Sequence, residues 1–65
     1  MNTEILKELR KQNKFSQEEM ARTLNISLRA YQLKEKGLNE FLLSELITMS
    51  DKFNMSLLEF MDRIV

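Results

Sequence analysis

The chain has 65 residues, with no cysteine, no histidine, ten acidic and ten basic side chains. This length predicts one domain, residues 1–65, with a modest core. Without cysteine or histidine, disulfides, thiolate metal sites and the usual general base are excluded, so we expect neither an enzyme nor a metal or cofactor. No apolar run is long enough to span a membrane, and the charged N-terminal segment is unlike a signal peptide, so we expect a cytoplasmic protein.

The charges are unevenly distributed along the chain. Residues 37–65 carry two basic and five acidic side chains. Residues 7–36 carry four acidic side chains and eight basic ones: Lys7, Arg10, Lys11, Lys14, Arg22, Arg29, Lys34 and Lys36. Zero net charge disfavours DNA binding, because phosphate contacts dominate affinity, whereas the positive N-terminal half favours it.

One glycine and no proline indicate helices joined by short turns. The first helix is expected over residues 3–13, with an apolar stripe formed by Ile5, Leu6 and Leu9. The basic residues at its end are either a solvated helix end or phosphate contacts. Phe15, in the following loop, is expected to enter the core.

Residues 15–37 predict two short helices, about 17–24 and 28–36, separated by a tight turn. Ser16 and Glu19 have the spacing of a capping box, and Ser27 can cap the second helix. Asn25 tolerates the left-handed conformation required where the first helix ends, and Gly37 ends the second. This is the pattern of a helix-turn-helix.

Two further helices are expected, over about 40–53 and from Leu57 onward. Asn39 is a plausible N-cap for the first of them, Asn54 ends it, and Ser56 with Glu59 forms a second capping box. The apolar face of the first is predicted to contain Leu42, Leu43, Leu46, Ile47, Met49, Ser50 and Phe53. One face of the last is predicted to contain Leu57, Phe60, Met61 and Ile64, extended by Leu58 and Val65.

Several segments together resemble the Cro/repressor-type helix-turn-helix family. They are Leu9-Arg10-Lys11, residues 16–21 (SQEEMA), residues 24–27 (LNIS), Tyr31-Gln32, residues 35–37 (EKG), Leu46-Ile47 and residues 53–57 (FNMSL) with Glu59. The resemblance covers about residues 5–61. It implies an all-α fold, a compact five-helix bundle of the lambda-repressor-like DNA-binding type with a central helix-turn-helix. It also implies binding to double-stranded DNA, usually as a homodimer, with residues 28–36 in the major groove.

The resemblance also implies the DNA-binding residues. Gln17 would contact phosphate and brace the second helix of the motif, and Lys36 would contact phosphate. Arg29 could pair with guanine and Gln32 with adenine; the alternative for each is an ordinary exposed side chain. The full predicted set is Ser16, Gln17, Ser27, Leu28, Arg29, Gln32, Leu33 and Lys36.

This sequence departs from the family pattern at two places. Lys34 stands where the family usually has an apolar residue, and Leu33 and Leu28 make the outward face half hydrophobic. That face fits either thymine methyl groups or a protein. Phe41 stands near the place where relatives often have proline. With Leu38, Leu42 and Leu43 it makes this segment unusually apolar, which predicts either an exposed interface or a better-filled core.

Two functions are compatible with these features. The first is a small transcriptional regulator of Cro type, a phage or mobile-element switch that binds operator DNA. The second is an antirepressor or modulator that uses the same fold to bind a repressor protein. The possible protein-interface residues are Leu28, Leu33, Phe41, Leu58, Met61 and Val65, of which the last three are expected to mediate self-association. We expect no small-molecule ligand and no membrane partner.

Overall fold

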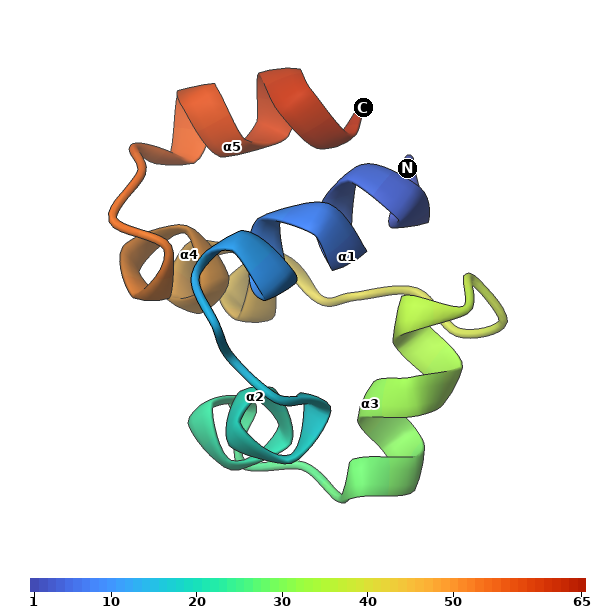
Figure 1. Cartoon of the computed structure of the whole chain (residues 1–65). Helices are drawn as coiled ribbons and strands as arrows, with labels where there is room; N and C mark the ends of the chain where they lie inside the picture. Colours follow the sequence, from blue (N-terminus) through green and yellow to red (C-terminus); the bar gives the residue numbers. More distant parts are fainter.

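The computed structural model describes all 65 residues as an all-α fold without strands. Its five helices are α1 (Thr3–Gln12), α2 (Gln17–Leu24), α3 (Leu28–Glu35), α4 (Leu43–Lys52) and α5 (Leu57–Ile64). Helices α1 and α5 lie at one end of the bundle, and α2 and α3 lie at the other (Figure 1). The two ends of the chain lie side by side, and the Asn2 amide donates to the Ile64 carbonyl. No helix has the length and apolar content needed to cross a membrane. The expected fold class is confirmed.

The helix-turn-helix has the predicted local signals. The Ser16 hydroxyl accepts from the Glu19 amide, and the Glu19 carboxylate accepts from the Ser16 amide, both at 3.0 Å. Asn25 ends α2 in the left-handed conformation with φ 58°. Gly37, with φ 81°, turns the chain after α3, and a residue with a β-carbon would be strained at that angle. These short-range contacts determine where α2 and α3 begin and end.

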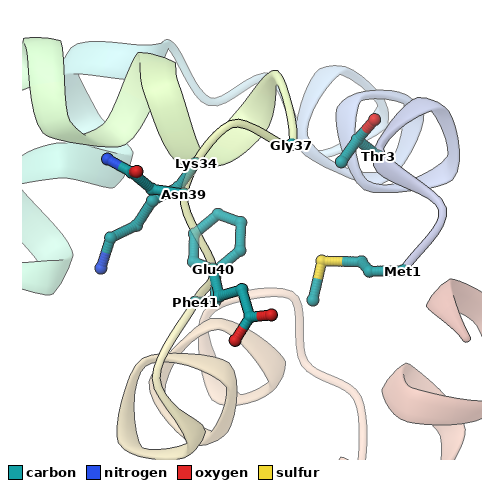
Figure 2. Close-up of a pocket in the computed structure, with 7 residues that line it drawn as sticks. All are labelled: Met1, Thr3, Lys34, Gly37, Asn39, Glu40 and Phe41. Carbon is teal, nitrogen blue, oxygen red and sulfur yellow. The ribbon is translucent and has the colours of Figure 1, made fainter.

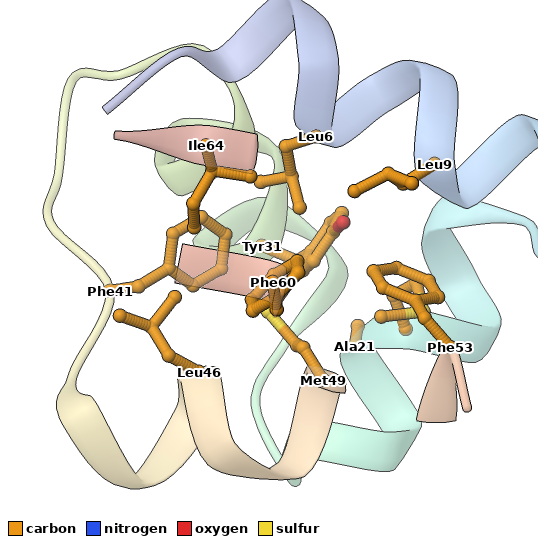
Figure 3. Close-up of a cluster of buried hydrophobic side chains, with 11 residues drawn as sticks. Leu6, Leu9, Ala21, Tyr31, Phe41, Leu46, Met49, Phe53, Phe60 and Ile64 are labelled. Carbon is orange, nitrogen blue, oxygen red and sulfur yellow. The ribbon is translucent and has the colours of Figure 1, made fainter. Parts of the chain in front are cut away.

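The core lies where the five helices meet, and Figure 3 shows its side chains converging from every helix. Its members are Leu6, Leu9, Met20, Ala21, Tyr31, Phe41, Leu46, Met49, Phe53, Phe60 and Ile64. Phe41 is therefore a core residue, so of its two predicted roles the better-filled core is confirmed and the exposed interface is excluded at this position. Its ring packs edge-on against Tyr31, with 6.0 Å between centroids.

Helix α4 begins three residues later than predicted, at Leu43. Asn39 is not its N-cap. The extended segment before α4 brings the Phe41 ring to Tyr31, and Leu42 occupies the N-cap position with an extended backbone. Leucine has no capping side chain, so only the second half of a capping box is present: the Glu45 carboxylate accepts from the Leu42 amide at 2.8 Å.

Only part of the predicted apolar face of α4 is buried. Leu46, Met49, Ser50 and Phe53 point inward, but no helix covers the opposite edge. Leu42, Leu43 and Ile47 are 62%, 63% and 43% exposed. The predicted apolar face is therefore broad, but only its inner part belongs to the core.

Two other predicted apolar contacts lie at the edge of the core. Phe15 is half-buried, and its ring stacks on Phe53 at 6.2 Å between centroids. The ammonium group of Lys52 covers the other part of that ring, 4.6 Å from its centroid. On α5, Leu57 and Met61 are half-buried beside the buried Phe60 and Ile64. Helix α5 therefore packs as its pattern predicted.

Candidate nucleic-acid interface

Helix α3 has an inner side packed into the bundle and an outer side facing solvent. Tyr31 and Glu35, four residues apart, are 0% and 1% exposed and face the core. The outward arc follows the helical period at Leu28, Arg29, Gln32, Leu33 and Lys36. In Figure 1 this helix stands at one corner of the molecule, with α2 beside it. Its outer side is therefore open to a large partner such as a DNA groove.

A buried hydrogen-bond network holds the inner side of α3. The Arg10 guanidinium binds Glu35 in a two-point geometry, through Nε to Oε2 at 2.9 Å and Nη2 to Oε1 at 3.1 Å. Arg10 Nη1 also donates to the Phe15 carbonyl at 2.9 Å. The Gln17 side chain, from the start of α2, donates to Glu35 Oε1 at 2.9 Å. One carboxylate thus joins α1, α2 and α3.

The network keeps Glu35 ionised. Burial alone would raise the pKa of its carboxyl group, but the hydrogen bonds from Arg10 and Gln17 outweigh burial and hold that pKa below its usual range. The Tyr31 hydroxyl lies buried beside this carboxylate and makes no hydrogen bond. Burial and the adjacent negative charge of Glu35 raise the pKa of Tyr31, so its hydroxyl stays neutral. The inner side of α3 therefore has one fixed negative charge, neutralised by Arg10.

Gln17 extends this network to the outer side of α3. Its carbonyl oxygen accepts from the side-chain amide of Gln32 at 3.2 Å. The predicted bracing of α3 by Gln17 is confirmed, whereas its phosphate contact stays a prediction. The bond also places the start of α2, with Ser16 and Gln17, next to the outward arc of α3.

The structure brings most of the predicted DNA-binding residues together. The hydroxyl oxygens of Ser16 and Ser27 cap α2 and α3 by accepting from backbone amides. Arg29 and Lys36 are exposed, and neither forms an ion pair. Leu28 is 38% exposed, while Leu33 is half-buried. The half-hydrophobic outer face that the sequence predicted is therefore present.

The predicted protein-interface residues do not form one surface. Leu28 and Leu33 lie on α3, and Phe41 is buried. Leu58 and Val65 lie on α5 and are 83% and 84% exposed. Any self-association through α5 therefore leaves the outer side of α3 free.

Ion pairing reduces the free positive charge of the N-terminal half. Four of its basic residues form ion pairs: Lys7 with Glu4, Arg10 with Glu35, Arg22 with Glu18 and Lys34 with Glu45. The other four are Lys11, Lys14, Arg29 and Lys36. These residues are all exposed, so they are the cations available to phosphates.

Arg10 is the functional residue that the sequence interpretation missed. The sequence places Arg10 in a basic cluster at the end of the first helix, which predicts either a solvated helix end or phosphate contacts. In the structure only 8% of Arg10 is exposed, and it pairs with Glu35. Spacing contained a signal for this pair. Arg10 follows Leu6 by four residues, and Glu35 follows Tyr31 by four, so opposite charges lie on two inward stripes.

The structure has one cavity, of about 360 Å³, between the N-terminus and the connection from α3 to α4. Met1 and Thr3 line one part of it, and Lys34, Gly37, Asn39, Glu40 and Phe41 line the rest (Figure 2). None of the predicted DNA-binding residues lines this cavity, so it is separate from the outer side of α3.

The fold and this arrangement define a helix-turn-helix protein. The family model described as Helix-turn-helix matches residues 6–60, which is most of the chain. No curated protein and no solved structure matches it. The chain belongs to the lambda repressor/Cro-like helix-turn-helix family, a family of DNA-binding regulatory domains. Membership supports a DNA-binding transcription regulator that binds double-stranded DNA.

Proposed function

We propose that this protein is a small transcriptional regulator that binds operator DNA with α3 in the major groove, as a phage-type switch. The observation that carries the proposal is the contrast between the two sides of α3. Its inner side is fixed by the Glu35 network, while Arg29 and Lys36 on its outer side have no protein partner. A rigid helix with free donors is suited to reading base edges.

Each predicted residue has a distinct role in this proposal. Arg29 pairs with the two acceptors of guanine, and Leu28 and Leu33 contact thymine methyl groups. Ser27 and Gln32 also face bases. The start of α2, with Ser16 and Gln17, contacts the phosphate backbone, where the positive end of the helix dipole and its free amides favour an anion.

Lys36 makes a second phosphate contact at the other end of α3. Self-association is proposed through α5, where Leu58 and Val65 are seven residues apart and share an exposed edge. Met61 lies half-buried beside them. A symmetric dimer would place two copies of α3 in successive major grooves, about 34 Å apart. We propose that a regulator of this kind acts in the cytoplasm.

A DNA titration at several salt concentrations tests this function. The protein is incubated with a random-sequence library, the bound sites are selected, and affinity is measured between 50 and 200 mM salt, the range over which phosphate contacts cause losses of roughly 10³-fold or more. We expect log affinity to fall by about 0.9 for each phosphate contact per tenfold rise in salt. Absence of binding to the library at the lowest salt would refute the proposal.

Arg29→Ala tests which side of the molecule reads DNA. We expect it to relax selection at one base position, at a cost of about 1–3 kcal/mol for the preferred base. Arg63→Ala, which removes an exposed cation from α5, is the matched control and is expected to leave selectivity unchanged. Equal selectivity in wild type and Arg29→Ala would exclude Arg29 as a base-reading residue.

The second candidate function is that of an antirepressor or modulator that binds a repressor protein. Zero net charge and the exposure of Leu28 on α3 favour it. It predicts that Leu28→Glu or Leu33→Glu abolishes capture of the related repressor, while circular dichroism shows the fold intact. Leu43→Glu on α4, at a residue that is 63% exposed, is the control for a nonspecific effect of a new charge. Capture that survives in both α3 variants excludes this face as the docking site.

A further inference from the structure

Two hydrogen bonds connect Gln32, on the surface of α3, through Gln17 to Glu35, and in both the donor lies on the side away from Glu35. An ionised carboxylate accepts hydrogen bonds but cannot donate them. Gln17 must therefore turn its NH₂ group toward Glu35 Oε1, where the distance is 2.9 Å. That choice leaves the Gln17 carbonyl oxygen for Gln32, whose NH₂ group donates to it at 3.2 Å. The orientation of each side-chain amide is thus fixed by the one before it.

We infer that Gln17 is a positioning residue that fixes the direction of the Gln32 amide, and that Gln32 in this orientation distinguishes adenine from guanine at one base pair. The inference rests on the proposed reading of DNA by α3 and adds to it a base preference with a structural cause. The cause lies in Glu35, a residue that does not reach the outer side of α3.

The donors and acceptors left on Gln32 lead to this preference. A side-chain amide has two N–H donors and one carbonyl oxygen. Gln17 uses one N–H, so the second N–H and the carbonyl oxygen remain for a base edge. Adenine presents the N6 donor and the N7 acceptor in the major groove, which match this pair.

Guanine does not match the same orientation. It presents two acceptors, O6 and N7, so the Gln32 carbonyl oxygen would face another acceptor. A freely rotating amide could instead turn both N–H groups toward guanine. The bond to Gln17 prevents that rotation, and Gln32 is itself half-buried, which further limits its conformers. The two hydrogen bonds therefore make Gln32, which could otherwise bind either purine, selective for adenine.

The decisive variant is Gln17→Met, which has a similar length and no amide. Affinity is measured for the selected site and for its single base-pair substitutions, using wild type, Gln17→Met, Gln32→Met and Gln12→Met. In wild type we expect one position where replacing adenine by guanine costs about tenfold or more. That ratio should fall below about threefold in both Gln17→Met and Gln32→Met. Gln12→Met, which alters an exposed glutamine at the end of α1, should keep it.

A nuclear magnetic resonance readout tests the two hydrogen bonds without DNA. The side-chain NH₂ signals of Gln32 should shift in Gln17→Met and stay in place in Gln12→Met. A Gln32 signal unaffected by Gln17→Met would show that the bond is absent in solution and would overturn the inference.

The failures of the two proposals are distinguishable. If wild type selects no DNA site, the proposed function fails, and the base preference of Gln32 fails with it. If wild type selects a site but Gln17→Met keeps the full adenine preference that Gln32→Met loses, the proposed function stands and only the role of Gln17 is wrong. An adenine preference that survives in Gln32→Met overturns the role of Gln32.

Discussion

Two buried ion pairs join α3 to its neighbours, and their geometry differs. Arg10 binds Glu35 through two nitrogens, and the two side chains are 10% and 1% exposed. Lys34 binds Glu45 through a single ammonium group at 2.5 Å, with side chains 14% and 8% exposed. The first pair joins α3 to α1 and the second joins it to α4, from neighbouring positions in the last turn of α3. Both pairs are buried, but only in the Arg10 pair do two nitrogens donate to both oxygens of the carboxylate.

This difference separates the roles of two neighbouring residues in the last turn of α3. The guanidinium fork fixes both the position and the rotation of Glu35, and Gln17 adds a third donor to the same carboxylate. The ammonium of Lys34 is a point charge that also lies 5.8 Å from the Phe41 ring centroid. We therefore expect the Arg10 pair to be more sensitive to the loss of its cation than the Lys34 pair.

The largest effect is expected from Arg10→Ala. The variant leaves the Glu35 carboxylate buried without its main partner, which costs about 3–5 kcal/mol. Since a domain of this size has a total stability of roughly 3–10 kcal/mol, much of the free energy of unfolding would be lost. Urea denaturation followed by circular dichroism measures the change.

The control for Arg10→Ala is the double variant Arg10→Met with Glu35→Met. It removes both charges and fills the space, so it should recover a large part of the lost stability. A loss below about 1 kcal/mol in Arg10→Ala would contradict the structural role assigned to the pair, because it falls under the cost expected for an unpaired buried charge.

The second pair is expected to be asymmetric. Glu45→Ala removes both the ion pair and the acceptor for the Leu42 amide, and we expect a loss of about 1–3 kcal/mol. Lys34→Met leaves that cap in place, but the buried Glu45 carboxylate loses its counter-charge and keeps the Leu42 amide as a partner, so we expect the smaller loss of the two, about 1–2 kcal/mol. Thermal melting of both variants compares the two costs. Equal losses would show that the cap at Leu42 contributes little.

Acid should weaken the Arg10 pair. The folded-state pKa of Glu35 lies below its unfolded value of about 4.3, so the unfolded chain binds the proton more tightly. The contribution of Glu35 is complete above the unfolded pKa and is lost as pH falls through the folded pKa, by about 1.4 kcal/mol for each unit between the two. Urea titrations from pH 7, above the unfolded pKa, down to pH 2.5 measure this loss.

Glu35→Gln is the comparison for this pH dependence. It lacks the titrating group, so its stability should be lower at neutral pH and should fall less steeply in acid. An equally steep fall in wild type and Glu35→Gln would assign the acid sensitivity to other carboxylates.

The smallest effect is expected at the exposed pair of Arg22 and Glu18. Its atoms are 3.7 Å apart, and the side chains are 75% and 69% exposed. Arg22→Ala should therefore change the free energy of unfolding by about 0.5 kcal/mol or less, and salt should reduce that change further. If chemical denaturation shows a change of more than about 1 kcal/mol, burial does not explain why the ion pairs contribute differently to the free energy of unfolding.

The parts of the fold that the sequence predicted correctly depend on short-range contacts. The capping boxes at Ser16 and Ser56 involve partners three residues away, and Asn25 and Asn54 act through their own backbone angles. Such signals can be read without knowing where any other helix lies. The helix-turn-helix was therefore predictable nearly to the residue.

The incorrect predictions depend on contacts between distant residues. Arg10 and Glu35 are 25 residues apart, so their pairing requires the relative position of α1 and α3. The late start of α4 depends on Phe41 reaching Tyr31, and the exposure of Ile47 depends on which edge of α4 has no neighbour. The sequence identified Lys34 as a departure from the family pattern, but its partner Glu45 became evident only in the structure.

The central claim is that the network holds α3 so that its outer side reads DNA. The most direct test records backbone amide signals of the protein while its selected DNA site is added. The account predicts that the large shifts fall on residues 28–36 and on Ser16 and Gln17, while Leu43 on α4 is unaffected. Shifts concentrated on α4 or α5, with none along α3, would contradict it.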